Sequence, residues 1–446
     1  MNKKNRKAII ICFSLIILGI GASPTSSTVD KTSKTYSSFY IENPIEGVIA
    51  YIELDGDIYL LNGERNERFQ LTQDANRFRY QNPQFSPDGR MLAYLKNDPS
   101  QGESKFDLHG LDFETMNSRL LTENVDQWGN FDWSPDSQFI VFGYSLGISC
   151  EAVEKNSAKG IWKVSIESGQ IEELVPPKNG NLPLKKPKYS FDSEWISYES
   201  YPCFSEGWNA HSWKISSHQE YNFGMSTLDW MQNQNLLALT EEVSGGGTGD
   251  LYRISPDLRE KQLIFKPQDL AASNPYWSPE GNWLALRLLT RVEEFFFSEE
   301  EASDWVDKLV LVRSDGSQAQ EICSTIEINA CQFQSWSPTG SQIIFTTGSE
   351  PNQEWKLYSL ESNSISNLTD FGIGGMDWIQ SVTLPTSPSD NANFKTDVPA
   401  TQSPLQSKAE QVKNNSNNNS FLIIFGVGVM VISVIILIFM VAFKRG

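Results

Sequence analysis

The segment most suggestive of covalent chemistry in this 446-residue chain is GYSLG, at residues 143–147. It matches the G-x-S-x-G pattern in which a serine, here Ser145, is the nucleophile of a hydrolase. Such a serine stands on a turn from a strand to a helix, and an acid and a histidine follow it in the chain. No helical pattern follows Ser145, and only His211 and His218 lie downstream. We therefore predict no catalytic residue here.

Metal ligands are equally sparse in the sequence. The three histidines are scattered and lack the spacing of zinc ligands. The acidic turn at residues 53–59 and the glycine-rich loop at residues 244–250 carry oxygen ligands that suit calcium, but neither follows the EF-hand pattern. A solvated turn explains both segments better. The sequence predicts no metal site and no cofactor.

A binding role has a stronger candidate, the segment RVEEFFFSEEEASDWVDK at residues 291–308. Ser298 and Glu301 form a capping box, which predicts a short helix. The predicted binding residues are aromatic or acidic: Phe295, Phe296, Phe297, Glu299, Glu300, Glu301, Asp304 and, in another loop, Trp208. The alternative is a helix that packs its phenylalanines against the rest of the protein and leaves its acids in water.

The elements that position these loops recur along the chain as hairpin signatures. FSPDGRMLAY, WSPDSQFIVF, WSPEGNWLAL and WSPTGSQIIF each combine an aromatic residue, a turn and a strand-like run. Proline presets the backbone of the turn, serine or aspartate bonds to it, and glycine relieves the closing residue. The signature begins at seven aromatic residues: Phe85, Trp133, Tyr189, Trp230, Trp277, Trp336 and Trp378.

A constant spacing links the aromatic residues to the strand that follows them. In six units a small or β-branched residue comes eight positions later: Ala93, Val141, Ser197, Ala238, Ala285 and Ile344. Large residues set against small ones at a fixed register predict sheets that nest on one another. A β-sandwich would explain the alternation of apolar residues in the strands but not this constant spacing.

Two further strand-like runs follow each hairpin, so each unit holds four strands and no convincing long helix. Four-stranded units that repeat in this way predict an all-β fold, the β-propeller. The unit at residues 48–72 lacks a first strand, and GGMDWIQS at residues 374–381 is a first strand without a unit. Pairing the two predicts seven blades, in a ring closed by the chain ends.

The quoted signatures resemble the WD40-like repeat (PD40) of TolB-like proteins, which also occurs in the propellers of prolyl oligopeptidase and dipeptidyl peptidase IV relatives. The resemblance covers residues 45–382 at the level of the repeat and implies a propeller. The units at Tyr189 and Trp230 depart from the motif, so six blades, as in TolB, are the alternative to seven. TolB also has an α/β domain before its propeller, for which residues 24–45 are too few.

The longest insertions fall between the second and third strands of their units, at residues 145–159, 199–210, 241–249 and 290–307. Equivalent loops of a propeller emerge on the same face, so we expect these four to share one rim.

Four cysteines remain outside the N-terminal apolar run, an even number that suits disulfides in an oxidising compartment. Cys150 and Cys203 lie in corresponding insertions of adjacent units, whereas Cys323 and Cys331 flank a seven-residue link. We therefore predict one disulfide between Cys150 and Cys203 and another between Cys323 and Cys331.

The chain ends predict export and membrane anchoring. A basic start precedes an apolar run that is too short to span a bilayer comfortably, which is typical of a signal peptide, with an uncleaved anchor as the alternative. Near the C-terminus, 23 apolar or small residues are followed by KRG, which predicts a spanning helix with its tail in the cytoplasm. The expected parts are a signal peptide (1–23), a lead-in (24–45), the propeller (46–382), a disordered Ser/Asn/Pro-rich stalk (383–420), a transmembrane helix (421–443) and a cytoplasmic tail (444–446).

The charge of the exterior part argues against nucleic-acid partners. Six of the 36 basic residues lie in the two terminal segments, which leaves 30 basic against 55 acidic residues, a net charge of −25. Such a surface repels nucleic acid and anionic lipid. We predict a monomer on the cell membrane, with its propeller outside the cytoplasm, that binds a protein or peptide, or a glycan, without catalysis. The alternative is a hydrolase or lyase that acts on glycans or esters from the propeller channel.

Overall fold

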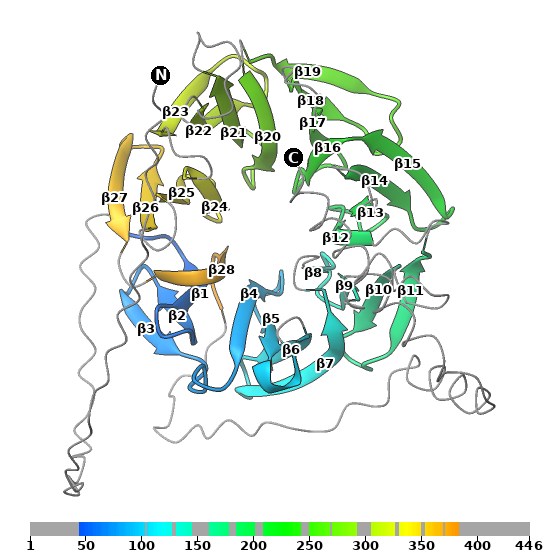
Figure 1. The fold of residues 1–446 in the computed structure, drawn as a ribbon, viewed down its shortest axis with the longest axis vertical. Helices are drawn as coiled ribbons and strands as arrows, with labels where there is room; N and C mark the ends of the chain where they lie inside the picture. Colours follow the sequence, from blue (N-terminus) through cyan, green and yellow to red (C-terminus); the bar gives the residue numbers. More distant parts are fainter. Residues whose placement is uncertain are drawn as a thin grey trace, which may run out of the picture. The chain divides into compact units, whose positions relative to one another are not determined.

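Seven antiparallel sheets of four strands each stand as blades around a central axis (Figure 1). The computed structural model describes residues 44–382, except for segments 103–104, 127–130, 145–159, 178–183, 201–207, 242–248, 268–269, 292–304, 326–329, 349–352 and 369–370. In each blade the first strand lies nearest the axis and the fourth forms the outer edge. We number the blades in chain order.

The first four blades have the following strands, given from the axis outward. Blade 1 consists of β28 (Phe371–Ile379), β1 (Val48–Glu53), β2 (Ile58–Asn62) and β3 (Glu67–Gln70). Blade 2 consists of β4 (Arg79–Phe85), β5 (Met91–Asn97), β6 (Phe106–Asp112) and β7 (Asn117–Val125). Blade 3 consists of β8 (Phe131–Trp133), β9 (Phe139–Gly143), β10 (Ile161–Ser165) and β11 (Ile171–Val175). Blade 4 consists of β12 (Leu184–Tyr189), β13 (Trp195–Ser200), β14 (Asn209–Lys214) and β15 (Gln219–Gly224).

The remaining three blades complete the ring. Blade 5 consists of β16 (Ser226–Trp230), β17 (Leu237–Glu241), β18 (Leu251–Ile254) and β19 (Lys261–Phe265). Blade 6 consists of β20 (Leu270–Trp277), β21 (Trp283–Arg291), β22 (Trp305–Arg313) and β23 (Ala319–Thr325). Blade 7 consists of β24 (Gln332–Trp336), β25 (Gln342–Thr347), β26 (Glu354–Ser359) and β27 (Ser364–Leu368). The one helix among the described residues is the short 3-10 turn η1 (Pro99–Gln101).

A serine closes the turn between the first two strands of most blades. In blade 2, Ser86 Oγ accepts a hydrogen bond from the Met91 N–H at 2.9 Å and donates one to Asp88 at 2.6 Å. Gly89 then takes a φ of 68°, a conformation that glycine adopts without strain. The same bond to the backbone is made by Ser134, Ser190, Ser278 and Ser337. These contacts confirm the turn chemistry predicted from the SPDG signature.

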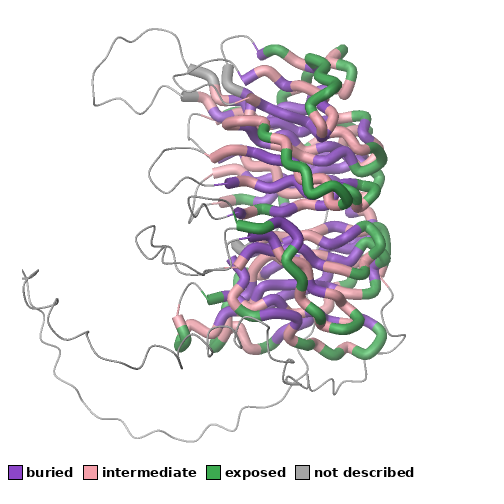
Figure 2. The backbone as a smooth tube through the Cα atoms, turned by 90° about the vertical axis from the view of Figure 1, so that its right-hand side faces the viewer, coloured by how far each residue is buried: buried purple, intermediate pink, exposed green. Residues whose placement is uncertain are grey.

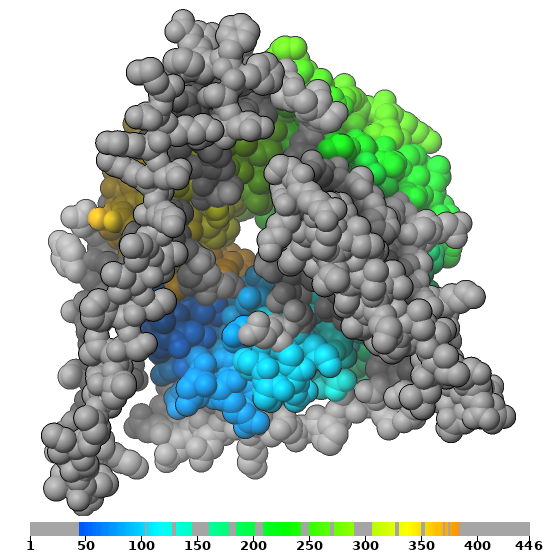
Figure 3. All heavy atoms as spheres, in the orientation of Figure 1, coloured from blue at the N-terminus to red at the C-terminus, as the bar shows by residue number. Residues whose placement is uncertain are grey.

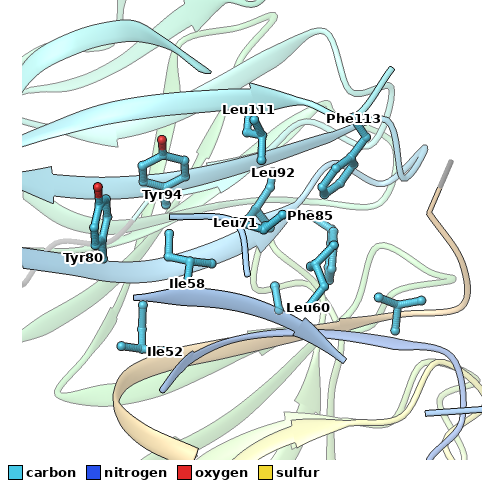
Figure 4. Close-up of a cluster of buried hydrophobic side chains, with 12 residues drawn as sticks. Ile52, Ile58, Leu60, Leu71, Tyr80, Phe85, Leu92, Tyr94, Leu111 and Phe113 are labelled. Atoms are coloured by element: carbon cyan, nitrogen blue, oxygen red, sulfur yellow. The ribbon is translucent and has the colours of Figure 1, made fainter. Parts of the chain in front are cut away.

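The aromatic residue of each signature packs against the preceding blade. Phe85 of blade 2 shares a buried cluster with Ala50, Ile52 and Leu60 of blade 1, and Figure 4 shows the side chains of this interface. Trp230 of blade 5 donates its indole N–H to Ser197 Oγ of blade 4 at 2.9 Å. The other blades pair Trp133 with Ala93, Tyr189 with Val141, Trp277 with Ala238, Trp336 with Ala285 and Trp378 with Ile344. The constant spacing in the sequence therefore records contacts between blades, because each small residue makes room for the next aromatic ring.

The last strand of the chain closes the ring. β28 pairs with β1, with Trp378 opposite Ile49 and Asp377 opposite Ala50. Gly47 lies at this junction with a φ of 62°, and a Cβ there would sit 2.3 Å from the carbonyl oxygen of Ile379, so only glycine fits. This closure is the one predicted from the incomplete units at the two chain ends.

The residues before β1 add a second contact across the closure, between blade 1 and blade 7. Gln342 of blade 7 donates to the Pro44 carbonyl at 2.8 Å and accepts from the Glu46 N–H at 3.1 Å. The Glu46 carboxylate in turn accepts hydrogen bonds from the hydroxyls of Thr339 and Ser341. The lead-in is thus bound to the first turn of blade 7.

Seven blades are confirmed, and the six-bladed alternative is wrong. The units at Tyr189 and Trp230, whose signatures depart from the repeat, form complete four-stranded blades. Within residues 44–382, as far as the structure describes them, no helix is long and apolar enough to span a membrane. The predicted signal peptide, stalk and transmembrane helix lie outside the described residues.

Candidate binding site at the axial channel

The connections between strands divide the propeller into two faces. The links from second to third strands, and from each blade to the next, leave by one face, which we call the loop face. The turns from first to second and from third to fourth strands leave by the other, the turn face. The strand ends that flank the four predicted insertions lie on the loop face, in blades 3 to 6. Buried residues fill the middle of the blades between these faces (Figure 2).

The predicted binding residues are only partly within the described structure. Phe295, Phe296, Phe297, Glu299, Glu300, Glu301 and Asp304 lie outside the described residues, as do the predicted short helix and Ser145. Trp208 is described and half-buried, just before β14 on the loop face. The candidate site residues that the structure describes lie around Trp208 and at the channel.

Seven equivalent residues, one per blade, line the axis. Each immediately precedes the signature aromatic residue, lies on the innermost strand and remains partly exposed, whereas the aromatic residue itself is buried. In blade 2, for example, Gln84 lies opposite Ala93 in the hairpin. We call these seven the axial residues: Asp377, Gln84, Asp132, Lys188, Asp229, Tyr276 and Ser335. Figure 3 shows that the centre of the ring is open.

In three alternate blades, an axial aspartate accepts a hydrogen bond from a backbone N–H of the next blade, and we call each of these contacts a clamp. Asp377 accepts a hydrogen bond from the Phe85 N–H at 2.7 Å, Asp132 from the Tyr189 N–H at 2.8 Å and Asp229 from the Trp277 N–H at 2.9 Å. The receiving strands β4, β12 and β20 all have a bulge just before this N–H. A bulge interrupts the ladder of backbone hydrogen bonds, and the carboxylate of the preceding blade satisfies the N–H at that interruption.

The same bulges place residues with left-handed backbones near the channel. Asn82, Lys186 and Asn274 have φ values of 49°, 50° and 49°, and each lies three residues before the aromatic residue of its blade. Asparagine tolerates this conformation well, whereas lysine adopts it at some cost. Strain of this kind persists where the surroundings enforce it, often where a bulge turns a side chain toward a site. Lys186 is therefore a candidate site residue.

Three lysines of the innermost strand β12 form ion pairs. Lys188 Nζ lies 2.8 Å from Asp229 of blade 5, Lys186 Nζ lies 3.1 Å from Glu199, and Lys185 Nζ lies 2.9 Å from Asp126. Burial lowers the pKa of Lys188, but the attraction of Asp229 outweighs this effect and raises the pKa overall. The Lys188 side chain is 44% exposed, so channel water screens this ion pair.

Two axial aspartates, Asp132 and Asp377, have a pKa above the usual range of the residue. Burial raises the pKa of Asp132 to about 7, and repulsion from Asp229 and Asp377 adds to the shift, against the Tyr189 N–H and Lys188. Burial likewise raises the pKa of Asp377 to about 6, against the hydrogen bonds from the N–H groups of Phe85 and Trp378. Blades 1, 3 and 5 thus hold acids that interact across the axis.

Trp208 forms a small patch on the loop face with the exposed end of Lys186. Its indole N–H donates to the Ser226 carbonyl at 3.1 Å, which links blade 4 to the start of blade 5. Lys186 Nζ lies 5.9 Å from the ring centroid of Trp208, and the same ammonium pairs with Glu199. An aromatic ring beside a lysine–glutamate pair can bind apolar and charged groups of a ligand together. We call Trp208, Lys186 and Glu199 the Trp208 patch.

Blade 4 also contains a serine, a histidine and a glutamate in the order of a catalytic triad. Ser200 Oγ lies 2.8 Å from His211 Nε2, and His211 Nδ1 lies 2.9 Å from Glu220 Oε1. Ser200 is only 1% exposed, and its strand pairs with a neighbour on both sides. A nucleophile needs access and nearby N–H donors for an oxyanion, and a buried serine within a sheet has neither. The three residues tie β13, β14 and β15 together.

The structure confirms one predicted disulfide, between Cys323 and Cys331, whose Cα atoms are 5.9 Å apart. It joins the outer strand of blade 6 to the start of blade 7. Cys150 and Cys203 lie outside the described residues, so their pairing stays a prediction. No cluster of three or more His, Cys, Asp or Glu side chains in the described ranges is arranged to hold a metal ion.

The axial residues were not predicted from the sequence, although the sequence contains a signal for them. The dipeptide Asp-Trp recurs at Asp132, Asp229 and Asp377, always directly before the signature tryptophan. Proline recurs two positions before the aromatic residue in the next blade of each pair, at Pro83, Pro187 and Pro275. Together, the Asp-Trp dipeptide in one blade and the proline in the next indicate a clamp and the bulge whose N–H it satisfies.

Comparison with known proteins finds likeness at the level of structure. No protein family matches the sequence, and no curated protein matches it. Among solved structures, an oligogalacturonate lyase from Vibrio parahaemolyticus is 15% identical with a TM-score of 0.51, and 71% of this chain and 92% of that chain are covered. A prolyl endopeptidase is 10% identical with a TM-score of 0.55, with coverage of 75% and 49%.

TolB from Acinetobacter baumannii is 14% identical with a TM-score of 0.40, and the match covers 63% of this chain and 64% of TolB. The chain therefore spans about two thirds of TolB and about half of the prolyl endopeptidase. Sequence identities this low indicate a similar fold but not a shared function. The protein is a seven-bladed β-propeller.

Proposed function

We propose that this protein is an exported, membrane-anchored propeller that binds a protein or peptide ligand at the loop face, without catalysing a reaction. The Trp208 patch and the loop-side mouth of the axial channel form the described part of the site, and the aromatic and acidic segment at residues 292–304 completes it. A propeller presents such loops from a rigid scaffold, which suits recognition.

The observation that carries this proposal is that both ends of the described chain, Pro44 and Val382, lie on the turn face. The lead-in at Pro44 and Glu46 is bound to the first turn of blade 7, on the turn face. The chain leaves β28 on the same face, where the Ser381 carbonyl lies close to Gly89 of blade 2. The described chain therefore begins and ends on the face opposite the loop face, which supports a partner at the loop face.

The alternative, a hydrolase or lyase that works from the channel, finds less support. Its strongest candidate, Ser200 with His211 and Glu220, is buried inside blade 4. The axial aspartates accept backbone hydrogen bonds from the neighbouring blade, so one side of each carboxylate is already engaged in structure.

Recovery of cross-linked partners by the full-length protein tests the proposal. We expect Trp208→Ala and deletion of residues 292–304 each to reduce recovery at least about fivefold, as loss of a contact residue does. Gln138→Ala is the matched control, since Gln138 is exposed on the turn face and should leave recovery unchanged. Equal recovery by all four proteins would remove the loop face from the site.

A further inference from the structure

The axial acids and Lys188 form a connected group at the centre of the ring. Asp132, Asp229 and Asp377 belong to blades 3, 5 and 1, and the first interacts with both of the others across the channel. Lys188 of blade 4 lies between the acids of blades 3 and 5 and pairs with Asp229 at 2.8 Å. The innermost strands contribute no other charged axial residue, since the remaining three are Gln84, Tyr276 and Ser335.

We propose that Asp132, Lys188, Asp229 and Asp377 form a proton-linked axial cluster, which holds the blades together most firmly when Asp132 and Asp377 are protonated and loosens the ring as the pH rises. The cluster carries one positive charge and, when fully ionised, three negative charges in a confined channel. Burial disfavours the ionised forms of Asp132 and Asp377, and the repulsion of Asp229 and Asp377 adds to this effect at Asp132. A bound proton relieves both effects.

The clamps show why protonation does not undo the contacts between blades. A carboxylic acid keeps a carbonyl oxygen that can accept a hydrogen bond. Protonated Asp132 can therefore still accept the bond from the Tyr189 N–H, and protonated Asp377 the bond from the Phe85 N–H. Proton loss therefore adds repulsion without adding a new partner. Among the described residues, the phenols of Tyr189 and Tyr276 also interact with the cluster, and the Glu199 carboxylate faces Tyr276.

The sign of the pH effect follows from the direction of the two shifts. The folded protein holds protons on Asp132 and Asp377 with pKa values of about 7 and about 6, whereas an unfolded aspartate releases its proton near pH 4. Between about pH 4 and pH 7 the folded state thus binds more protons than the unfolded state, so the stability contributed by these groups falls as the pH rises. The channel wall becomes more negative over the same range.

Thermal unfolding of the full-length protein and of Asp132→Asn and Asp377→Asn tests the cluster. Asparagine keeps the acceptor oxygen of each clamp and mimics the protonated acid. The Tm difference between each variant and the wild type should be near zero at about pH 3.5, where the folded and the unfolded aspartates are both protonated. It should rise by on the order of 2 °C or more by pH 8. Glu361→Gln, which changes an exposed acid on the turn after β26, should give a difference that does not depend on pH.

A direct titration of the aspartate carboxyl groups in the wild-type protein tests the cluster even if the variants fold poorly. In wild-type protein labelled with carbon-13 at the aspartate carboxyl groups, one signal should titrate near pH 7 and another near pH 6. Asp132→Asn should lack the first signal and keep the second. Tm profiles of wild type and Asp132→Asn that stay parallel from pH 5 to pH 8 would overturn the proposal. So would a spectrum in which every aspartate titrates below pH 5.

Discussion

At Asp132, Asp229 and Asp377, a carboxylate on the channel wall also completes the hydrogen bonding of the next blade. Leaving a buried N–H without a partner costs about 1–3 kcal/mol, so each clamp offsets the ladder bond that the bulge removes. Asp229 has a second role because it also pairs with Lys188. These three aspartates therefore line the channel and also join the blades that surround it.

Replacement of Asp229 tests this double role. Asp229→Ala removes both the acceptor for the Trp277 N–H and the partner of Lys188, and we expect the free energy of unfolding to fall by about 2–4 kcal/mol. Asp229→Asn keeps the acceptor but loses the charge, and should cost about half as much. Urea unfolding followed by tryptophan fluorescence measures both. An alanine variant as stable as the wild type would contradict the clamp.

Ser200, His211 and Glu220 allow a second test at the scale of residues. If their role is to join three strands, the full-length protein should not react at Ser200 with a fluorophosphonate probe, because the serine is buried. His211→Ala should nevertheless lower the free energy of unfolding by about 2–4 kcal/mol, since it removes a buried ring and leaves the Ser200 hydroxyl without its partner. Glu220 keeps the hydrogen bond from Tyr198. Labelling by mass spectrometry that disappears in Ser200→Ala would show instead that the serine is a reactive nucleophile.

At the scale of elements, the links between blades carry the chain from the outer edge of one sheet to the axis of the next. The disulfide between Cys323 and Cys331 spans one such link, from β23 to the start of β24. Cys331 is fully buried in a cluster that includes Trp336 and Ile343 of blade 7. The disulfide thus fixes the entry of blade 7 against blade 6.

Removal of this disulfide should weaken the junction of blades 6 and 7. Closing a loop of this length contributes about 2 kcal/mol by restricting the unfolded chain, so Cys323→Ser with Cys331→Ser should lower the free energy of unfolding by that amount. Intact-mass measurement with and without a thiol reagent establishes the bond in the wild type. Free thiols at both positions in the native protein would contradict the pairing.

The sequence predicted the hairpins well because their signals are local. Ser86, Asp88 and Gly89 determine a turn within five residues, and the structure has that turn. The bulges at Asn82, Lys186 and Asn274 were not predicted, because a bulge depends on the register between two strands and on an aspartate supplied by another blade. For the same reason the contact of Ser200 with His211 was not predicted, because it requires the register between β13 and β14.

At the scale of the whole molecule, the ring makes each blade depend on two neighbours. The aromatic residue of every blade enters the cluster of the preceding one, so the packing has no terminal blade once β28 pairs with β1. The closure joins residues more than 300 positions apart in the chain. Sequence could predict it because the two incomplete units complement each other, but the bond from Trp378 to the Glu46 carbonyl, which fastens the lead-in, carries no sequence signal.

Replacing residues 371–382 with a glycine–serine segment of equal length tests how far the propeller depends on that closure. The change removes β28, exposes the edge of β1 and leaves the clusters around Tyr51 and Phe85 open on one side. Because an unpaired edge and an open core favour local opening, we expect blades 7, 1 and 2 to become sensitive to protease first and the unfolding transition to broaden. Limited proteolysis with mass mapping, together with urea unfolding of the full-length protein, reports both effects. The same replacement at residues 389–400, within the predicted stalk, is the matched control and should leave the transition unchanged. A single sharp transition at the wild-type midpoint after loss of β28 would mean that the blades are stable as an open array, and that the pairing of the chain ends contributes little to the fold.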